Sequence, residues 1–306
     1  MSGLEHLDWS PTEEVARDVV TAARAAALHG LLDAPGEPPS KGAPLPILWH
    51  WLAFLPTVPQ SQLGPDGHPR LGGFLPPVQL PQRMFGAGEV AQGAVRVQAA
   101  EGEDGGVPDA GELRVGEPLE RRGAVTDVRS RTGRSGELVL VTVGYEVTGA
   151  GGSVSERQEL VYRDAPSRPP TETANPAPGA RPAAGPDNAC WEWGIDLKVG
   201  PTLLFRFSAL TYNAHRIHYD RAWATEVEGY PGLVVHGPLQ AVGLAELCRR
   251  YVPGRRLRRF QFRAVSPAFD DGPVLLRGRS GDDGAVVLEA FNRRGATTMT
   301  AMGTLA

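Results

Sequence analysis

Histidines cluster in one short stretch of the chain, and an imidazole can move protons near neutral pH. His215, His218 and His236 all lie within residues 211–237, in the sequence TYNAHRIHYDRAWATEVEGYPGLVVHG. Because its charge changes close to pH 7, histidine serves as a general base or general acid. Asn213 adds a neutral side chain that can both donate and accept hydrogen bonds and so hold a water molecule. We therefore expect the chemistry of this protein to take place in this stretch.

The elements on either side of the stretch must position these side chains. Residues 203–209, LLFRFSA, alternate Phe205 and Phe207 at a period of two, which predicts a strand. A helical spacing of apolar residues begins near Gly237, and Pro238 suits the first turn of a helix. The N-terminus of such a helix presents free backbone donors, which attract an anion or a developing oxyanion.

The stretch resembles the hydratase motif of MaoC-like, hotdog-fold enoyl-CoA hydratases and dehydratases. That motif runs S-G-D-x-N-P-x-H and is followed later by I-x-H-G. Asn213 falls on the Asp of the motif, His218 falls on its His, and the VHG at 235–237 matches the later element. His215 and Arg216 replace the Asn-Pro pair. The acid of the motif has therefore become an amide in this chain.

Longer phrases are similar to a subfamily that includes mesaconyl-CoA hydratases and type 2 hydroxyacyl-thioester dehydratases. The phrases are TYNAHRIHYDR, EGYPGLVVHGPL, LPILWHWLAFLP, LGPDGHPRLGGFLPP and ERQELVYRDAP, so the resemblance covers nearly the whole chain. It implies an α+β double hotdog, in which antiparallel sheet wraps long helices. It also implies a metal-free hydro-lyase without a cofactor, acting on a short or branched enoyl-CoA similar to mesaconyl-CoA.

Reversible syn hydration of an enoyl thioester needs proton transfer, a held water molecule and stabilisation of the enolate oxygen. The resemblance implies that His218 moves the proton, that Asn213 holds the water and that Gly237 offers its N–H to the oxyanion. Since an amide cannot carry a proton through the reaction, His218 must act alone or use Asp220. His218 and Asn213 are therefore the candidate catalytic residues, and Gly237 is the candidate oxyanion-binding residue.

Three further residues are candidates for the substrate site. His215 and His236 can contact the substrate, or they can orient the loops through ring hydrogen bonds. Arg83 can face an anionic group of the substrate, or it can be an ordinary exposed arginine. His215, His218 and His236 could also supply three nitrogens to zinc, but no cysteine lies nearby and we predict no metal.

Other functions stay open at this point. Because Asn213 is an amide where the motif has an acid, the protein could also be a hotdog protein that binds an acyl thioester with weak or no turnover. A hotdog thioesterase is a third possibility, because water activated by His218 could attack the carbonyl carbon. A serine hydrolase lacks support, since the chain has no G-x-S-x-G motif. The glycines at 86 and 88 do not form a dinucleotide fingerprint, because a third glycine and a βαβ context are missing.

The N-terminal half predicts a helix, two irregular stretches and then an antiparallel meander. The helix is expected over residues 10–32. The aromatic residues at 48–54, LWHWLAF, can form core or line an acyl pocket. The stretch 64–77, rich in Gly and Pro, can be a substrate lid or an exposed connection. Strands are expected at residues 94–99, 124–129, 138–147 and 154–162.

A Pro/Ala/Gly-rich segment divides the chain into comparable halves. We predict an N-terminal hotdog module at 1–165, a linker at 166–188 and a C-terminal module at 189–306. Strands in the second half are expected at residues 258–262, 274–277, 285–291 and 297–305. The order of elements repeats between halves, which suggests two fused modules with a pocket at their junction.

Composition limits the class of protein further. The net charge is −4, from 31 basic and 35 acidic residues, which argues against a nucleic-acid partner. No apolar run reaches membrane length, and the two cysteines lie far apart without metal spacing. The N-terminus lacks the pattern of a secretory signal or transit peptide, so we expect a cytoplasmic location. The expected partner is acyl-CoA or an acyl carrier protein thioester, bound by a homodimer or a pseudo-dimeric monomer.

Overall fold

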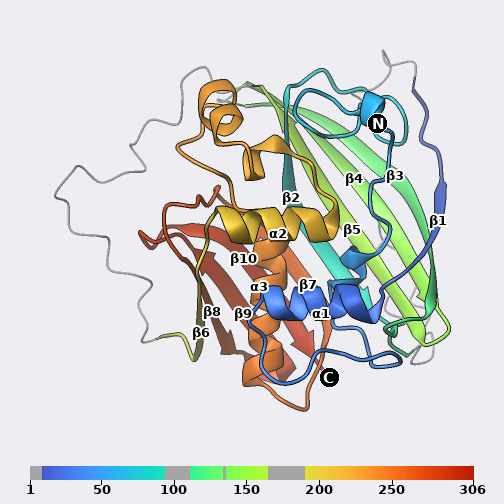
Figure 1. Ribbon diagram of the computed structural model, residues 1–306, viewed down its shortest axis with the longest axis vertical. Coiled ribbons are helices and arrows are strands. Elements are labelled where there is room, and N and C mark those ends of the chain that lie inside the picture. Colours follow the sequence, from blue (N-terminus) through green and yellow to red (C-terminus); the bar gives the residue numbers. More distant parts are fainter. Residues whose placement is uncertain (1–8, 94–110, 134–135, 165–189) are drawn as a thin grey trace.

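A computed structural model describes residues 9–93, 111–133, 136–164 and 190–306 of the protein (Figure 1). The strands in these ranges are β1 Glu14–Val19, β2 Gln82–Gln92, β3 Pro118–Gly133, β4 Gly136–Gly149, β5 Gly152–Arg163, β6 Trp193–Leu197, β7 Leu257–Ala264, β8 Val274–Ser280, β9 Ala285–Phe291 and β10 Thr297–Leu305. The α-helices are α1 Ala22–Leu31, α2 Pro201–Thr211 and α3 Gly237–Tyr251. Short helical turns include η1 Trp49–Leu52, η5 Arg216–His218 and η6 Trp223–Val227.

All the described strands join one antiparallel sheet in the order β1-β3-β4-β5-β2-β7-β10-β9-β8-β6. The first five strands come from the N-terminal half of the chain and the last five from the C-terminal half. β2 and β7 join the halves edge to edge, from Ala87 paired with Arg263 to Ala91 paired with Arg259. The sheet is therefore continuous across the two halves.

The strand order repeats on the two sides of the β2–β7 junction. Counting outward from it, the N-terminal half runs β2, β5, β4, β3, β1, and the C-terminal half runs β7, β10, β9, β8, β6. Each half also begins with one strand followed by helix, β1 then α1 and β6 then α2 and α3, before its remaining four strands. This correspondence supports a two-module interpretation. The predicted linker at 166–188 lies outside the described residues.

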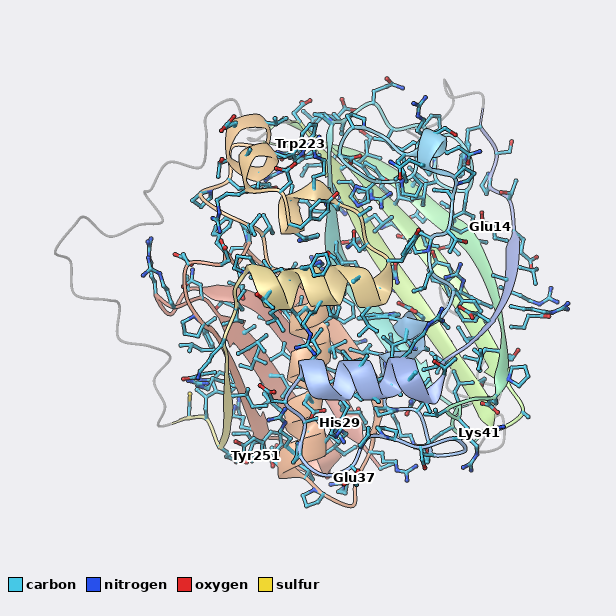
Figure 2. All side chains as sticks on the ribbon, in the orientation of Figure 1. Glu14, His29, Glu37, Lys41, Trp223 and Tyr251 are labelled. Atoms are coloured by element: carbon cyan, nitrogen blue, oxygen red, sulfur yellow. The ribbon has the colours of Figure 1, made fainter. Side chains whose placement is uncertain are left out.

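α3 forms the centre of the C-terminal half. Every residue from Leu239 to Cys248 is buried, and the helix packs on strands β6 to β10. α1 packs against α2, and Figure 1 shows all three helices on the side of the sheet that faces the viewer. Figure 2 shows Tyr251 at the C-terminal end of α3 and His29 on α1. In the part of the chain that the structure describes, no helix is long and apolar enough to span a membrane.

The strand predicted at 203–209 is wrong, because these residues belong to helix α2. Leu204, Phe207 and Ser208 are buried, which is the i, i+3, i+4 spacing of a helix face. Phe205, which the alternating pattern placed on the same face as Phe207, is 63% exposed. Gly200 and Pro201 begin the helix in the way that Gly237 and Pro238 were expected to begin α3.

The N-terminal prediction is only partly confirmed. The helix predicted over residues 10–32 begins at Ala22, where the Thr21 side chain accepts a hydrogen bond from the Arg24 N–H, and residues 14–19 form strand β1 instead. β2 was missed, since its glycines interrupt the pattern of β-branched and aromatic residues that indicates a strand. The strand predicted at 94–99 lies outside the described residues. The other predicted strands and helix α3 are confirmed.

Candidate active site

A sharp turn after α2 directs the motif into the protein. Tyr212 ends the helix in the left-handed conformation, with φ 52°. The Asn213 N–H then donates to the Ser208 carbonyl over 2.8 Å. Asn213 itself is held by its side chain, because its Oδ1 accepts a hydrogen bond from the His215 N–H at 3.0 Å. With Oδ1 used in this way, the amide N–H₂ of Asn213 is the part left to face other groups.

His218 is buried beside Val234, and its tautomer follows from one contact. Its Nδ1 lies 2.7 Å from the Val234 carbonyl oxygen, which can only accept, so Nδ1 must donate. The lone pair of the neutral ring is then on Nε2. Burial lowers the pKa of His218 to about 4, although the Val234 hydrogen bond opposes the shift. At pH 7 His218 is therefore a neutral proton acceptor.

His236 lies behind His218. The two rings stack with centroids 3.6 Å apart and 19° between their planes. His236 is fully buried, its Nε2 lies 2.8 Å from the Ser208 hydroxyl, and the residue does not line the cavity described below. Burial and the charge of His218 hold the pKa of His236 well below its usual value. These contacts support the orienting role for His236 over direct substrate contact.

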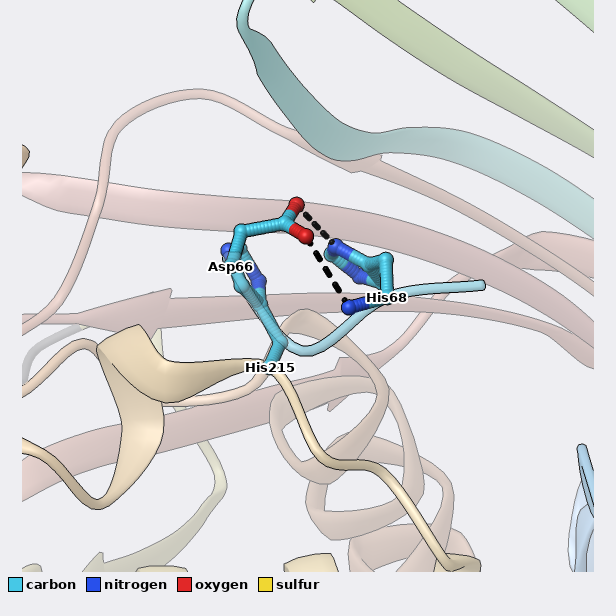
Figure 3. A group of neighbouring side chains, drawn as sticks. All are labelled: Asp66, His68 and His215. Atoms are coloured by element: carbon cyan, nitrogen blue, oxygen red, sulfur yellow. Dashed lines mark hydrogen bonds and ion pairs between the residues drawn. The ribbon is translucent and has the colours of Figure 1, made fainter. Parts of the chain in front are cut away.

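His215 lies next to Asp66 and His68, two residues that the hydratase motif does not include. Its ring centroid is 4.0 Å from that of His68 and 5.4 Å from that of His218. Asp66 accepts hydrogen bonds from His68 twice, from the ring Nδ1 at 2.8 Å and from the backbone N–H at 3.0 Å (Figure 3). The motif therefore lies against an Asp–His pair from the N-terminal half.

The loop that carries Asp66 and His68 is docked on the motif through its backbone. The Arg216 N–H donates to the Asp66 carbonyl at 2.8 Å, and the Arg216 guanidinium donates to the Pro65 carbonyl at 3.1 Å. Gly67 has φ +90°, and a Cβ there would overlap the Ala214 carbonyl group. This part of the stretch 64–77 is thus a fixed wall of the site and not an exposed connection.

Burial and neighbouring charges together set the protonation state of this group. Burial raises the pKa of Asp66, but the hydrogen bond and charge of His68 outweigh it and the pKa is lowered overall. Burial and the nearby charge of Arg83 lower the pKa of His68 to about 4, against the opposing effect of Asp66. Burial and His68 lower the pKa of His215 still further. The histidines of the site are therefore neutral at pH 7.

A cavity of about 1450 Å³ opens in front of these residues. Its lining from the site comprises His68, Arg83, Asn213, His215, His218, Gly237 and Gln240. Gly237 lies at the first residue of α3, and the nearest atom to a Cβ built there would be Cδ1 of Phe85, at 3.0 Å. The cavity therefore joins the motif histidines, the N-terminus of α3 and residues of the N-terminal half in one space.

The aromatic stretch 48–54 serves both of its expected purposes. Leu48, Trp49 and Leu52 belong to the core, whereas Trp51 and Phe54 line the cavity. Trp51 packs edge-on against Phe85 and Phe262, and the guanidinium of Arg121 lies between the rings of Phe54 and Tyr145, 4.9 and 4.8 Å from their centroids. Trp51, Phe54, Phe85 and Tyr145 therefore form an apolar wall of the cavity.

A second acid–histidine pair lines the same cavity away from the motif. His50 Nε2 lies 2.7 Å from a Glu156 carboxylate oxygen, and the other oxygen accepts from Trp51 and Gln158. Burial raises the pKa of Glu156, but the charge and hydrogen bond of His50 outweigh it, so the carboxylate stays ionised. Both carboxylate oxygens of Glu156 already take part in hydrogen bonds within the protein, which favours a role of this pair in fixing the cavity wall.

The geometry bears on two alternatives, the assistance of His218 by Asp220 and a zinc site formed by three histidines. Asp220 forms an ion pair with Arg216 at 2.7 Å and does not line the cavity, so it is not placed to assist His218. The zinc triad considered as an alternative includes His236, whose Nε2 is 2.8 Å from the Ser208 hydroxyl. In the described part of the chain, the residues that bring potential ligand atoms together are Asp66, His68 and His215, within 4.8 Å of one another.

Comparison with known proteins agrees with this arrangement. The antiparallel sheet of two similar halves, with a histidine motif that stacks on the residue preceding α3, agrees with a MaoC-like hydratase or dehydratase. A family model for hydroxyacyl-thioester dehydratase type 2 matches residues 48–270, and the chain belongs to that family. It is 40% identical, over 98% of both chains, to a mesaconyl-C(4)-CoA hydratase of Chloroflexus aurantiacus.

Solved structures show the same fold at lower sequence identity. HtdX of Mycobacterium tuberculosis matches with a TM-score of 0.62 and 14% identity, covering 95% of this chain and 99% of that one. A second M. tuberculosis protein, described as a double hotdog fold, matches with a TM-score of 0.51 and 15% identity, covering 97% and 96%. The expected α+β double hotdog fold is confirmed.

Proposed function

We propose that this protein hydrates a short, branched, dicarboxylic enoyl-CoA, with mesaconyl-C4-CoA going to a citramalyl-CoA as the best candidate. The observation that carries the proposal is the orientation of His218. Its Nδ1 is committed to the Val234 carbonyl, so a neutral ring presents the Nε2 lone pair as the available base, and His218 lines the cavity beside Asn213. This geometry suits the removal of a proton from water.

The reaction follows from these positions. Nε2 of His218 takes one proton of the water as its oxygen bonds to Cβ of the substrate. The electrons of the C=C bond move towards the thioester oxygen, where the N-terminus of α3 at Gly237 favours the developing negative charge. The protonated His218 then returns its proton to Cα on the same face. One water is consumed, and His218 ends as it began.

Arg83 supports a dicarboxylic substrate. It lies half-buried on β2 and lines the cavity, and no carboxylate of the described residues forms an ion pair with it. A cation held in a largely apolar cavity favours an anionic ligand group, and arginine matches a carboxylate in a bidentate manner. The full-length similarity to the mesaconyl-C(4)-CoA hydratase supports the same substrate class and a CoA carrier.

The test is a substrate panel analysed by mass spectrometry. Crotonyl-, mesaconyl-C4-, itaconyl- and long-chain enoyl-CoA are incubated with the protein, and products are scored as hydrated thioester, free acid or unchanged. We expect hydration, with mesaconyl-C4-CoA preferred. Release of free CoA would identify a thioesterase, and binding without product would identify an acyl-thioester-binding protein.

A matched variant links the activity to the site. His218→Ala should lower kcat by roughly 100- to 10,000-fold, the usual contribution of a general base, while the affinity for acyl-CoA changes little. Retained hydration in this variant would assign the proton to another group. Gel filtration of the same protein decides between the homodimer and the pseudo-dimeric monomer, and we propose the monomer because both modules are present in one chain.

A further inference from the structure

We propose that His68, oriented by Asp66, is the second group that holds the reacting water. It would take over the role of the acid that the hydratase motif has at position 213, where this chain has an amide. This inference rests on the proposed hydration. His68 is assigned as a catalytic residue, because it would touch the water. Asp66 is a positioning residue, because it acts on the water only through His68.

The tautomer of His68 is fixed in the same way as that of His218. Asp66 Oδ2 lies 2.8 Å from His68 Nδ1, and an ionised carboxylate can only accept, so Nδ1 carries the hydrogen. The Nε2 lone pair is left to accept a hydrogen bond. His68 and His218 both line the cavity, so the site contains two neutral imidazoles whose tautomers leave Nε2 free to accept a hydrogen from water.

Both acceptors belong to rings that lie next to His215. The ring of His215 contacts that of His68, with centroids 4.0 Å apart, and that of His218, with centroids 5.4 Å apart. A charge on His68 also lowers the pKa of His218, as expected for groups in one site. A water molecule has two hydrogens to donate, and this arrangement offers one acceptor for each.

The loop holds His68 in place before any substrate binds. Asp66 is anchored by its carbonyl to the Arg216 N–H, and the chain at Gly67 lies too close to Ala214 for any side chain. Gly64 closes the turn, because its N–H donates to the His68 carbonyl at 2.7 Å. A group whose position is fixed by its surroundings orients a reactant without cost during the reaction.

The departures from the hydratase motif agree with this assignment. Position 213 has lost the acid that could hold the water. Position 215 has gained the ring that contacts His68, and position 216 has gained a backbone N–H that proline lacks and that binds Asp66. The changes at 215 and 216 therefore form the contact between the motif and the Asp66–His68 pair, and the change at 213 removes the acid that this pair would replace.

The chemical step balances with His68 unchanged. The water donates one hydrogen to His218 Nε2 and the other to His68 Nε2, which directs an oxygen lone pair towards Cβ. His218 takes its proton as the O–Cβ bond forms and later delivers it to Cα. The O–H bond that points to His68 stays intact and becomes the hydroxyl of the product, so His68 ends neutral.

A divalent metal is the competing occupant of this group. Asp66, His68 and His215 could ligate an ion such as zinc. Two features favour water: both Asp66 oxygens are already bonded to His68, and the positive charge of Arg83 acts on His68, His215 and Asp66 alike. The experiment must therefore also measure metal dependence.

The experiment compares four variants of the whole chain on the enoyl-CoA that the wild-type protein hydrates fastest. His68→Ala removes the acceptor, and we expect kcat to fall about 100-fold, the effect of misplacing a reactant by about 1 Å, with KM nearly unchanged. His68→Gln keeps an acceptor oxygen and should recover part of the loss. His29→Gln is the matched control, because His29 is a buried histidine of α1 outside the cavity, and it should keep wild-type kcat (Figure 2).

Asp66→Asn separates catalysis from loop structure. Asparagine keeps the oxygen that accepts from the His68 N–H, so the turn is retained, but it presents an N–H₂ group to Nδ1. The tautomer of His68 should then reverse, with the hydrogen on Nε2. We expect a fall in kcat close to that of His68→Ala and an exchange of the two ¹⁵N chemical shifts of His68 in the NMR spectrum of histidine-labelled protein.

Each outcome has a distinct meaning. An active wild-type protein with full kcat in His68→Ala would refute the role of His68 and leave the proposed hydration intact. A wild-type protein that hydrates none of the enoyl-CoAs would refute the proposed function instead. Activity that is lost on chelation and restored by zinc would make His68 a metal ligand and overturn the inference. A ¹⁵N pattern in the wild type with the hydrogen on Nε2 would also overturn it.

Discussion

His218 and His236 stack face to face, with ring centroids 3.6 Å apart, and both are buried. Two imidazolium ions cannot share this arrangement at low cost, since like charges repel strongly where water is excluded. Burial holds the pKa of His218 at about 4 and that of His236 also below the usual 6.5. The stack is stable only while both rings are neutral, which links the fold to pH.

The free energy of unfolding should therefore fall as the pH drops from 6.5 towards 4. In this window the unfolded chain binds protons that the folded chain excludes, so the stabilisation is complete above pH 6.5 and is lost on acidification. Each such histidine contributes a slope of about 1.4 kcal/mol per pH unit. Urea denaturation at several pH values measures the slope. His218→Gln should reduce it by about one proton, and an equal slope in the variant would contradict the prediction.

Asn213→Asp should fold normally but lose most of its turnover. Aspartate can still accept from the His215 N–H, so the turn after α2 is preserved. The remaining oxygen, however, replaces an N–H₂ donor with a negative charge. We expect kcat to fall about 100-fold, as for other losses of one positioned donor. Steady-state kinetics across pH provide the measurement.

The opposite result for this variant would also be informative. Raised activity with a shifted acidic limb would show that a carboxylate at 213 restores proton transfer, because it would also raise the pKa of His218. Asn213→Ala completes the series. If alanine leaves kcat unchanged, Asn213 holds neither water nor substrate.

Gly237→Pro should lower kcat by about 100- to 1,000-fold, because proline removes the N–H at the start of α3 that is assigned to the oxyanion. Gly237→Ala is the steric control. It keeps the N–H but places a Cβ 3.0 Å from Phe85, which must shift slightly. Wild-type turnover in a folded proline variant would remove Gly237 from the mechanism.

Arg83→Gln should reduce kcat/KM for mesaconyl-C4-CoA by about 10- to 100-fold, since a hydrogen bond to a charged group contributes about 1.5–3 kcal/mol. Crotonyl-CoA, which has no second carboxylate, is the internal control and should be affected much less. Equal losses on both substrates would assign Arg83 to the general electrostatics of the site and not to carboxylate recognition.

Cleavage between residues 176 and 186 should leave the two halves associated. The β2–β7 pairing and a core built from both halves hold the modules together independently of the connecting segment. A protease site inserted there, followed by gel filtration of the cleaved protein, tests this. Halves that elute as separate folded monomers would contradict the shared-sheet architecture.

Local patterns were sufficient for most strands and for α3 but failed where two interpretations were equally periodic. Phe205 and Phe207 alternate as in a strand, yet the buried residues are Leu204, Phe207 and Ser208 because tertiary packing selected the helix face. The residues of β2 were missed, since Gly86 and Gly88 interrupt the pattern that indicates a strand. In the sheet these glycines accept the close approach of Val161 and Phe262 from the neighbouring strands.

Half of the candidate site was visible in the sequence. His218, Asn213 and Gly237 belong to one continuous motif, so their proximity could be predicted, and the structure places all three in the lining of one cavity. Asp66 and His68 lie far away in the chain, in a stretch whose composition predicts only a loop. No local pattern could reveal that the loop docks on Arg216, because the contact depends on how the two halves pack.

The hydrogen bond between the Arg216 N–H and the Asp66 carbonyl affects how the motif can be transferred to another protein and which substitutions are expected among relatives. The motif and the loop form one structural unit, although the chain separates them by nearly half its length. Grafting residues 211–218 alone onto a hotdog protein with a different loop would transfer the histidines without their partner. A relative with proline at position 216 cannot make this bond, so we expect substitutions at 66, 68, 215 and 216 to occur together.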